Sequence, residues 1–155
     1  MDINTFYAVT SATCFTLVGL WWSVVKDKTE WFQDEAKKRL AGGVYASFLI
    51  PGLMSLAAQI GSDGQIIWRG IFAIASLLGL IYTSRLIQLT RTVNPDGAFS
   101  RNSWVVPALY ALILFCAVFM PAKFLGLQAL QIEALLLSGL ILCAHMLAWE
   151  FSTSA

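Results

Sequence analysis

One acidic residue, Glu133, lies inside an otherwise apolar run near the C-terminus of the chain. A carboxylate at the centre of a bilayer costs about 2.5–3.5 kcal/mol on insertion scales, so such a group is usually paired, protonated or in contact with water. Glu133 is therefore either an ion- or proton-binding group or the structural partner of a buried cation. Arg69 is the cation expected at a similar depth, so an Arg69–Glu133 ion pair is the structural alternative.

The same run carries three further polar residues at heptad spacing, namely Gln131, Ser138 and His145. On an ideal helix they share one stripe, whereas Glu133 lies off that stripe and about 18 Å from His145 along the axis at 1.5 Å per residue. We therefore expect no acid–histidine dyad within this helix. The stripe is a candidate lining for an ion pathway, although a buried histidine satisfied by its neighbours is the commoner arrangement.

Other chemistries lack the residues that they need. His145 is the only histidine, so the chain cannot supply two histidine ligands to a haem, and no three-ligand metal set is visible. Cys14, Cys116 and Cys143 lie in apolar runs without a C-x-x-C pair, and we interpret them as small buried residues. No Ser-His-Asp constellation or glycine-rich phosphate loop is evident. We expect no enzymatic activity, no cofactor and no metal.

The elements that must position these residues follow from the composition. The chain of 155 residues is 58% hydrophobic and 12% charged, whereas soluble domains are about a quarter charged. A helix needs about 20 apolar residues to cross a bilayer core. The sequence therefore predicts one all-α integral membrane domain, residues 1–155, with a bundle of five transmembrane helices at 3–25, 40–60, 66–89, 104–120 and 126–149. The short linker leaves a re-entrant or half-spanning pair as the alternative for the last two.

The basic residues orient these helices. Half of the Lys and Arg side chains fall in the amphipathic segment 26–39, and cytoplasmic loops carry an excess of such residues. The sequence therefore predicts a cytoplasmic segment 26–39, an N-terminus outside and a C-terminus in the cytoplasm. We expect a multi-pass protein of the plasma membrane.

The segment itself is predicted to be helical. Asp34 with Lys38 and Glu35 with Arg39 have the i,i+4 spacing and order that favour ion pairs on a helix. Trp31 and Phe32 are expected to dip into the headgroup layer while the charges face water.

Two of the helices have features that suggest contact or motion. In 40–60, Pro51 followed by Gly52 predicts a kink, which is either a static packing feature or a hinge. In 3–25, small and hydroxylated residues fall on one stripe. Such a stripe packs against another helix within the protomer, packs between protomers, or lines a hydrated path. Its members are Thr5, Ala8, Ala12, Thr16, Gly19 and Ser23, of which Thr16 and Ser23 are candidate pathway residues.

These features favour a small homo-oligomeric membrane channel or ion-translocating subunit. Five short-looped helices leave little room for an aqueous path, so a pore would form in a ring of protomers. The alternatives are a non-catalytic accessory subunit that binds other membrane subunits, and a lipophile-binding protein of the bilayer with an aromatic interior. The net charge of +1 argues against a nucleic-acid partner, which calls for a clustered basic surface.

Overall fold

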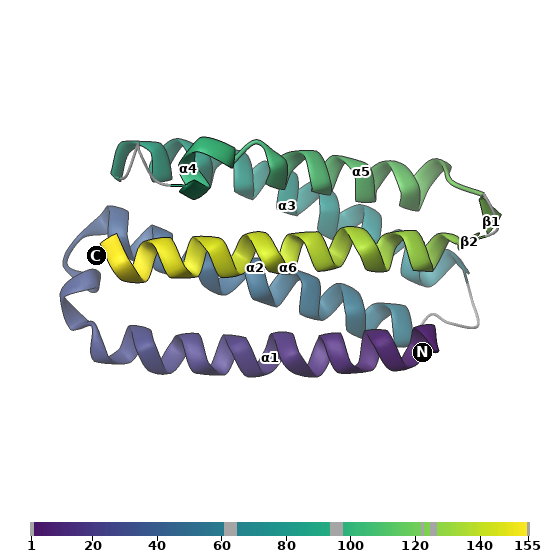
Figure 1. Cartoon of the computed structure of the whole chain (residues 1–155), viewed down its shortest axis with the longest axis horizontal. Coiled ribbons are helices and arrows are strands. Elements are labelled where there is room, and N and C mark those ends of the chain that lie inside the picture. The colour runs from purple at the N-terminus through teal and green to yellow at the C-terminus, as the bar shows by residue number, and fades with distance from the viewer. Residues whose placement is uncertain (1, 61–64, 94–97, 122, 125–126, 155) are drawn as a thin grey trace.

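The computed structural model describes residues 2–60, 65–93, 98–121, 123–124 and 127–154 (Figure 1). Its long helices are α1 (Ile3–Asp27), α2 (Glu35–Ile60), α3 (Gln65–Val93), α5 (Val105–Phe119) and α6 (Ala129–Ser154). The short elements are the 3-10 helix η1 (Thr29–Phe32), α4 (Ala98–Asn102), and the strands β1 (Lys123–Phe124) and β2 (Leu127–Gln128).

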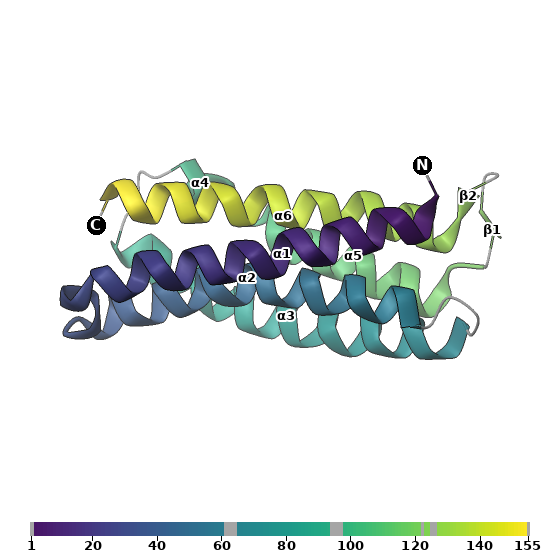
Figure 2. The same cartoon turned by 90° about the horizontal axis from the view of Figure 1, so that it is seen from below.

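The helical fold agrees with the sequence prediction. The described residues contain five helices that are long and apolar enough to cross a membrane, as in a multi-pass membrane protein. For the fourth, the apolar stretch runs over 21 residues from Phe99 to Phe119 and includes α4. Figures 1 and 2 show α3, α5 and α6 running together along the bundle, which disfavours a half-spanning pair. The predicted loops at 61–64 and 94–97 lie outside the described residues.

Helix α2 occupies the centre of the arrangement and contacts α1, α3 and α6, while α5 packs on α3 and α6. We call the two ends of the bundle the N-terminal end and the C-terminal end, after the chain terminus that lies at each (Figure 1). Helix α1 is inclined to α6 and comes nearest to it at the N-terminal end (Figure 2). At the N-terminal end, β1 and β2 pair antiparallel and return the chain from α5 to α6.

Small residues permit the closest helix contacts. A Cβ atom on Gly43 of α2 would lie 2.6 Å from the Leu86 side chain of α3, and one on Gly79 of α3 would overlap the ring of Tyr110 in α5. At both positions a larger residue requires the neighbouring side chain to shift. Membrane helices use small residues in this way because backbones must approach closely to gain contact energy.

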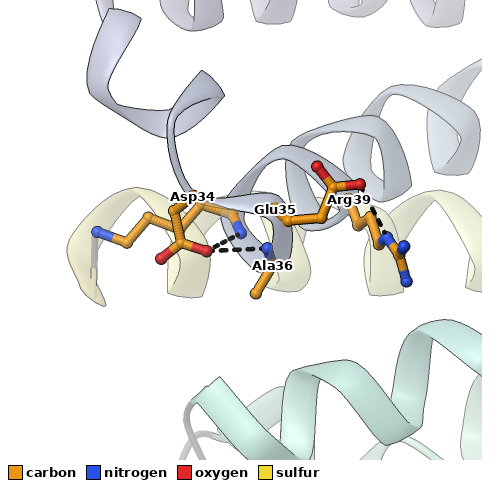
Figure 3. A network of polar contacts seen from close by, with 5 residues as sticks. Asp34, Glu35, Ala36 and Arg39 are labelled. Atoms are coloured by element: carbon orange, nitrogen blue, oxygen red, sulfur yellow. Dashed lines mark hydrogen bonds and ion pairs between the residues drawn. The ribbon is translucent and has the colours of Figure 1, made fainter.

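The connection between α1 and α2 is held by its own polar groups (Figure 3). The Asp34 Oδ1 atom accepts hydrogen bonds from the backbone N–H groups of Ala36, at 2.8 Å, and Lys37, at 3.3 Å. This is an N-cap, and it explains why α2 begins before residue 40. The predicted Glu35–Arg39 ion pair forms at 3.5 Å. The predicted Asp34–Lys38 ion pair does not form, because the Asp34 carboxylate caps the helix.

Trp31 is the clear departure from the prediction for this segment. Its side chain is 1% exposed and lies inside the bundle. Its ring is centred 4.5 Å from that of Phe151 in α6 and 6.1 Å from that of Trp21 in α1. The expectation that Trp31 dips into the headgroup layer is therefore wrong, because α1 and α6 leave space that the indole fills.

Candidate functional site

Glu133 lies in the second turn of α6, near the N-terminal end of the bundle. Its side chain has no exposed surface, and neither carboxyl oxygen has a hydrogen-bond partner among the described residues. Buried polar groups are nearly always paired, and an unpaired one costs about 1–3 kcal/mol. Glu133 is therefore the most costly polar group in this part of the bundle.

The sequence-predicted partner, Arg69, is engaged by another helix. Its guanidinium donates to the backbone carbonyl of Ala117 at 3.2 Å and to that of Met120 at 2.8 Å. Its central carbon lies 5.1 Å from the centre of the Trp68 ring. The last carbonyls of a helix have no partner within that helix, and a cation there is favoured by the helix dipole. Arg69 thus caps the C-terminus of α5.

The expected Arg69–Glu133 ion pair is consequently absent as a direct contact among the described residues. The Nε atom of Arg69 is also buried without a partner. The site therefore holds an unpaired acceptor group and an unpaired donor at similar depth in α6 and α3.

Tyr7 belongs to this site and was not singled out from the sequence. Its hydroxyl donates to the backbone carbonyl of Leu130 at 2.7 Å, one turn before Glu133. Its ring meets that of Phe72 edge-on, with centres 6.4 Å apart. The sequence offered one indication of this contact. Tyr7 lies at the same distance from the start of the first helix as Glu133 does from the start of the last.

The polar side chains of the heptad stripe on α6 form hydrogen bonds within the first part of the helix and its lead-in or to the preceding turn. Gln131 accepts from the backbone N–H of Gln128 at 2.9 Å, and Ser138 donates to the Ala134 carbonyl at 2.9 Å. The Nδ1 atom of His145 is 2.8 Å from the Ile141 carbonyl, which can only accept. As expected, none of these groups joins Glu133.

His145 is exposed and faces a groove, so it is not the buried histidine that we regarded as commonest. Its ring meets Phe48 of α2 edge-on, with centres 5.1 Å apart. The groove between α1 and α6 has a volume of about 300 Å³ and is lined by Leu17, Leu20, Phe48, His145, Trp149 and Ser152 among others. Apart from His145 and Ser152, these walls are apolar.

The small-residue stripe of α1 does not pack within the protomer. All six of its residues are exposed, and a Cβ atom added to Gly19 would meet nothing within 4 Å. The Thr16 hydroxyl donates to the Ala12 carbonyl at 2.8 Å, and the Ser23 hydroxyl donates to that of Gly19 at 3.2 Å. The face of α1 that contacts the bundle instead carries Tyr7, Ser11, Cys14, Trp21 and Val25.

Pro51 and Gly52 are both buried in α2 at its contact with α1. A Cβ atom on Gly52 would lie 3.0 Å from the Cβ atom of Cys14. Gly52 thus lies in close contact with α1, as the static-packing interpretation expects. A hinge at this position stays a prediction.

The described residues therefore contain a buried carboxyl site at one end and an apolar groove towards the other, and they include no cluster of His, Cys, Asp and Glu suited to a metal ion. No protein-family model, curated protein or solved structure matches this chain.

Proposed function

We propose that the protein is an ion-translocating membrane subunit in which Glu133 is the group that binds the ion or proton. The observation that carries this proposal is the complete burial of Glu133 with both carboxyl oxygens unpaired. Ionisable residues within membrane segments commonly mark ion or proton pathways. A residue kept only for structure would be expected to have a donor for each oxygen.

Glu133 faces the interior of the bundle, so it would act as a binding group inside one protomer and not as a wall residue of a pore between protomers. The centre of the bundle is filled by side chains with no exposed surface, including Val44, Phe72, Ile113 and Leu137. An aqueous path along the centre would have to pass between these apolar side chains. Translocation would accordingly require helix movement or a path at a contact between protomers.

The uncovered stripe of α1 supports association of protomers. Small and hydroxylated residues favour close contact between membrane helices, and here no part of the described protomer covers them. A symmetric assembly through this face would bring two copies of α1 together. Thr16 and Ser23 would then lie at the contact.

Conductance and proton flux across bilayers containing the purified protein test the proposal. We expect wild-type currents or flux that Glu133→Gln abolishes and Glu30→Gln leaves unchanged. The two substitutions make the same chemical change, but Glu30 is exposed in η1. Equal activity in wild type and Glu133→Gln would assign Glu133 a structural role. Silence from folded wild-type protein over a range of voltage and pH would favour the accessory-subunit alternative, which predicts copurification with other membrane subunits.

A second function, binding of a lipophile, is favoured by the groove between α1 and α6. Pockets for lipophilic ligands are concave and mostly apolar with a few polar groups, as His145 and Ser152 are here. Under this function a ligand raises the thermal unfolding temperature, Ala148→Trp removes that shift by filling the groove, and no conductance is seen.

A further inference from the structure

A second groove lies at the C-terminal end of the bundle, between α1, η1 and α2. Its volume is about 210 Å³, and its walls include Trp22, Val25, Phe32, Lys38 and Tyr45. It is separate from the Glu133 site, which lies at the other end of α6, and it shares Trp21 as a wall residue with the groove that contains His145.

Lys38 gives this groove a positive charge. It is the only charged residue among the lining side chains, and it has no ion pair among the described residues. Neither of the nearest acids along the chain pairs with Lys38, since Asp34 caps α2 and Glu35 pairs with Arg39 (Figure 3). The Lys38 ammonium is therefore free to bind an anion.

The remaining walls suit hydrocarbon at the boundary of a bilayer. Trp22 is 60% exposed, Phe32 48% and Tyr45 36%, although all three carry large rings. Tryptophan and tyrosine collect at membrane–water boundaries, where the ring contacts acyl chains and the polar edge reaches headgroups. Lys26 and Asp27 at the end of α1 also place the membrane–water boundary near this groove, because their charged side chains require water.

We propose that this groove binds an anionic phospholipid. The lipid phosphate lies against the Lys38 ammonium, and the first methylenes of an acyl chain lie against Trp22 and Phe32. A lysine on an amphipathic surface attracts anionic lipid by about 1 kcal/mol, which corresponds to roughly a five-fold preference over a zwitterionic lipid. This inference is independent of the function proposed for Glu133.

Quenching of tryptophan fluorescence by lipids with brominated acyl chains tests the site in vesicles. Brominated phosphatidylglycerol is compared with brominated phosphatidylcholine on the full-length protein. We expect the wild type to prefer phosphatidylglycerol about five-fold. Lys38→Ala and Lys38→Glu remove that preference, and Lys38→Arg retains it.

Lys28→Glu is the matched control, because Lys28 is exposed at the same end of the bundle and does not line the groove. Retention of the preference in Lys28→Glu with its loss in Lys38→Glu supports the groove as the site. Equal quenching of the wild type by the two lipids overturns the proposal. An equal loss in both glutamate variants also overturns it, since the attraction would then come from the general surface charge. If Lys38→Glu fails to fold, the proposal is tested by comparing Lys38→Ala with Lys38→Arg. It is supported if only the alanine variant loses the lipid preference and overturned if both variants behave alike.

Discussion

The polar groups near Glu133 donate to backbone carbonyls, and the one Arg69 nitrogen that is left unpaired, Nε, does not hydrogen-bond to the carboxyl group. The Tyr7 hydroxyl binds the carbonyl of Leu130, and two nitrogens of Arg69 bind the end of α5. The carbonyls at the C-terminal end of α5 have no partner within that helix, so they compete with the Glu133 carboxyl for the Arg69 donors. Among the described residues both oxygens of the Glu133 carboxyl stay unpaired, so a bound cation would supply a partner and a bound proton would remove the charge.

Replacing this carboxyl by an apolar side chain of similar volume should therefore stabilise the fold. We expect Glu133→Met to raise the free energy of unfolding by about 1–3 kcal/mol, since the unpaired group disappears without creating a cavity, and to abolish ion flux. Unfolding in mixed micelles measures the first effect, with Leu135→Met on the exposed side of α6 as the control. A loss of stability in Glu133→Met would show that the carboxyl makes a favourable interaction with Arg69.

Tyr7 ties the first helix to the last through one hydroxyl group. Tyr7→Phe removes only the hydrogen bond to Leu130, and we expect it to lower the free energy of unfolding by about 0.5–1.5 kcal/mol. Tyr82→Phe, on the surface of α3, should change it by less than about 0.5 kcal/mol. Denaturant titration of both variants makes the comparison. Equal effects would rule out a special role for the Tyr7 hydroxyl.

At the scale of helices, the absence of a side chain at Gly79 allows α3 to pack closely against Tyr110 of α5. Gly79→Ala would place a methyl group in the ring of Tyr110, and overpacking of this kind costs about 1–3 kcal/mol. Gly70→Ala in the same helix meets nothing within 4 Å and should be neutral or stabilise by up to about 1 kcal/mol through helix propensity. Thermal unfolding of the two variants separates packing from propensity. Similar stabilities would argue against the close crossing.

The indole of Trp31 joins η1 to α1 and α6. Trp31→Ala should lower the free energy of unfolding by about 3–5 kcal/mol, because it empties a fully packed position between Trp21 and Phe151. Phe32→Ala, at the neighbouring exposed position, should cost less than about 0.5 kcal/mol when measured without anionic lipid. Unfolding in zwitterionic micelles tests both. A small effect of Trp31→Ala would contradict the burial of Trp31 and support its predicted place in the headgroup layer.

At the scale of the whole molecule, the outward stripe of α1 is the surface through which we expect protomers to associate. Gly19→Leu should weaken the oligomer without affecting the protomer, since nothing lies within 4 Å of an added Cβ atom. Gly70→Leu has the same open surroundings on α3 and serves as the control. Light scattering after size-exclusion chromatography measures the mass of the protein assembly in each variant. A monomeric wild type, or equal dissociation by both variants, would contradict this interface.

Composition and hydropathy were sufficient to predict the five long helices and their approximate positions. In a bilayer, backbone N–H and C=O groups must be paired internally, so an apolar run of about 20 residues forms a helix whatever its neighbours are. The same reasoning singled out Glu133 as an anomaly, because its cost depends on the surrounding solvent and not on particular contacts. The Glu35–Arg39 pair was also predictable, since its geometry depends only on spacing along one helix.

Tertiary structure alone decided which helix faces meet. The sequence could not show that the small stripe of α1 faces away from the bundle, that Trp31 is buried, or that Tyr7 lies beside α6. It equally could not show that Arg69 binds the end of α5 in place of Glu133. Each of these outcomes depends on a choice among several helix pairings and several competing acceptors. Such choices are settled by shape and by the positions of unpaired carbonyls on segments that are far apart in the chain.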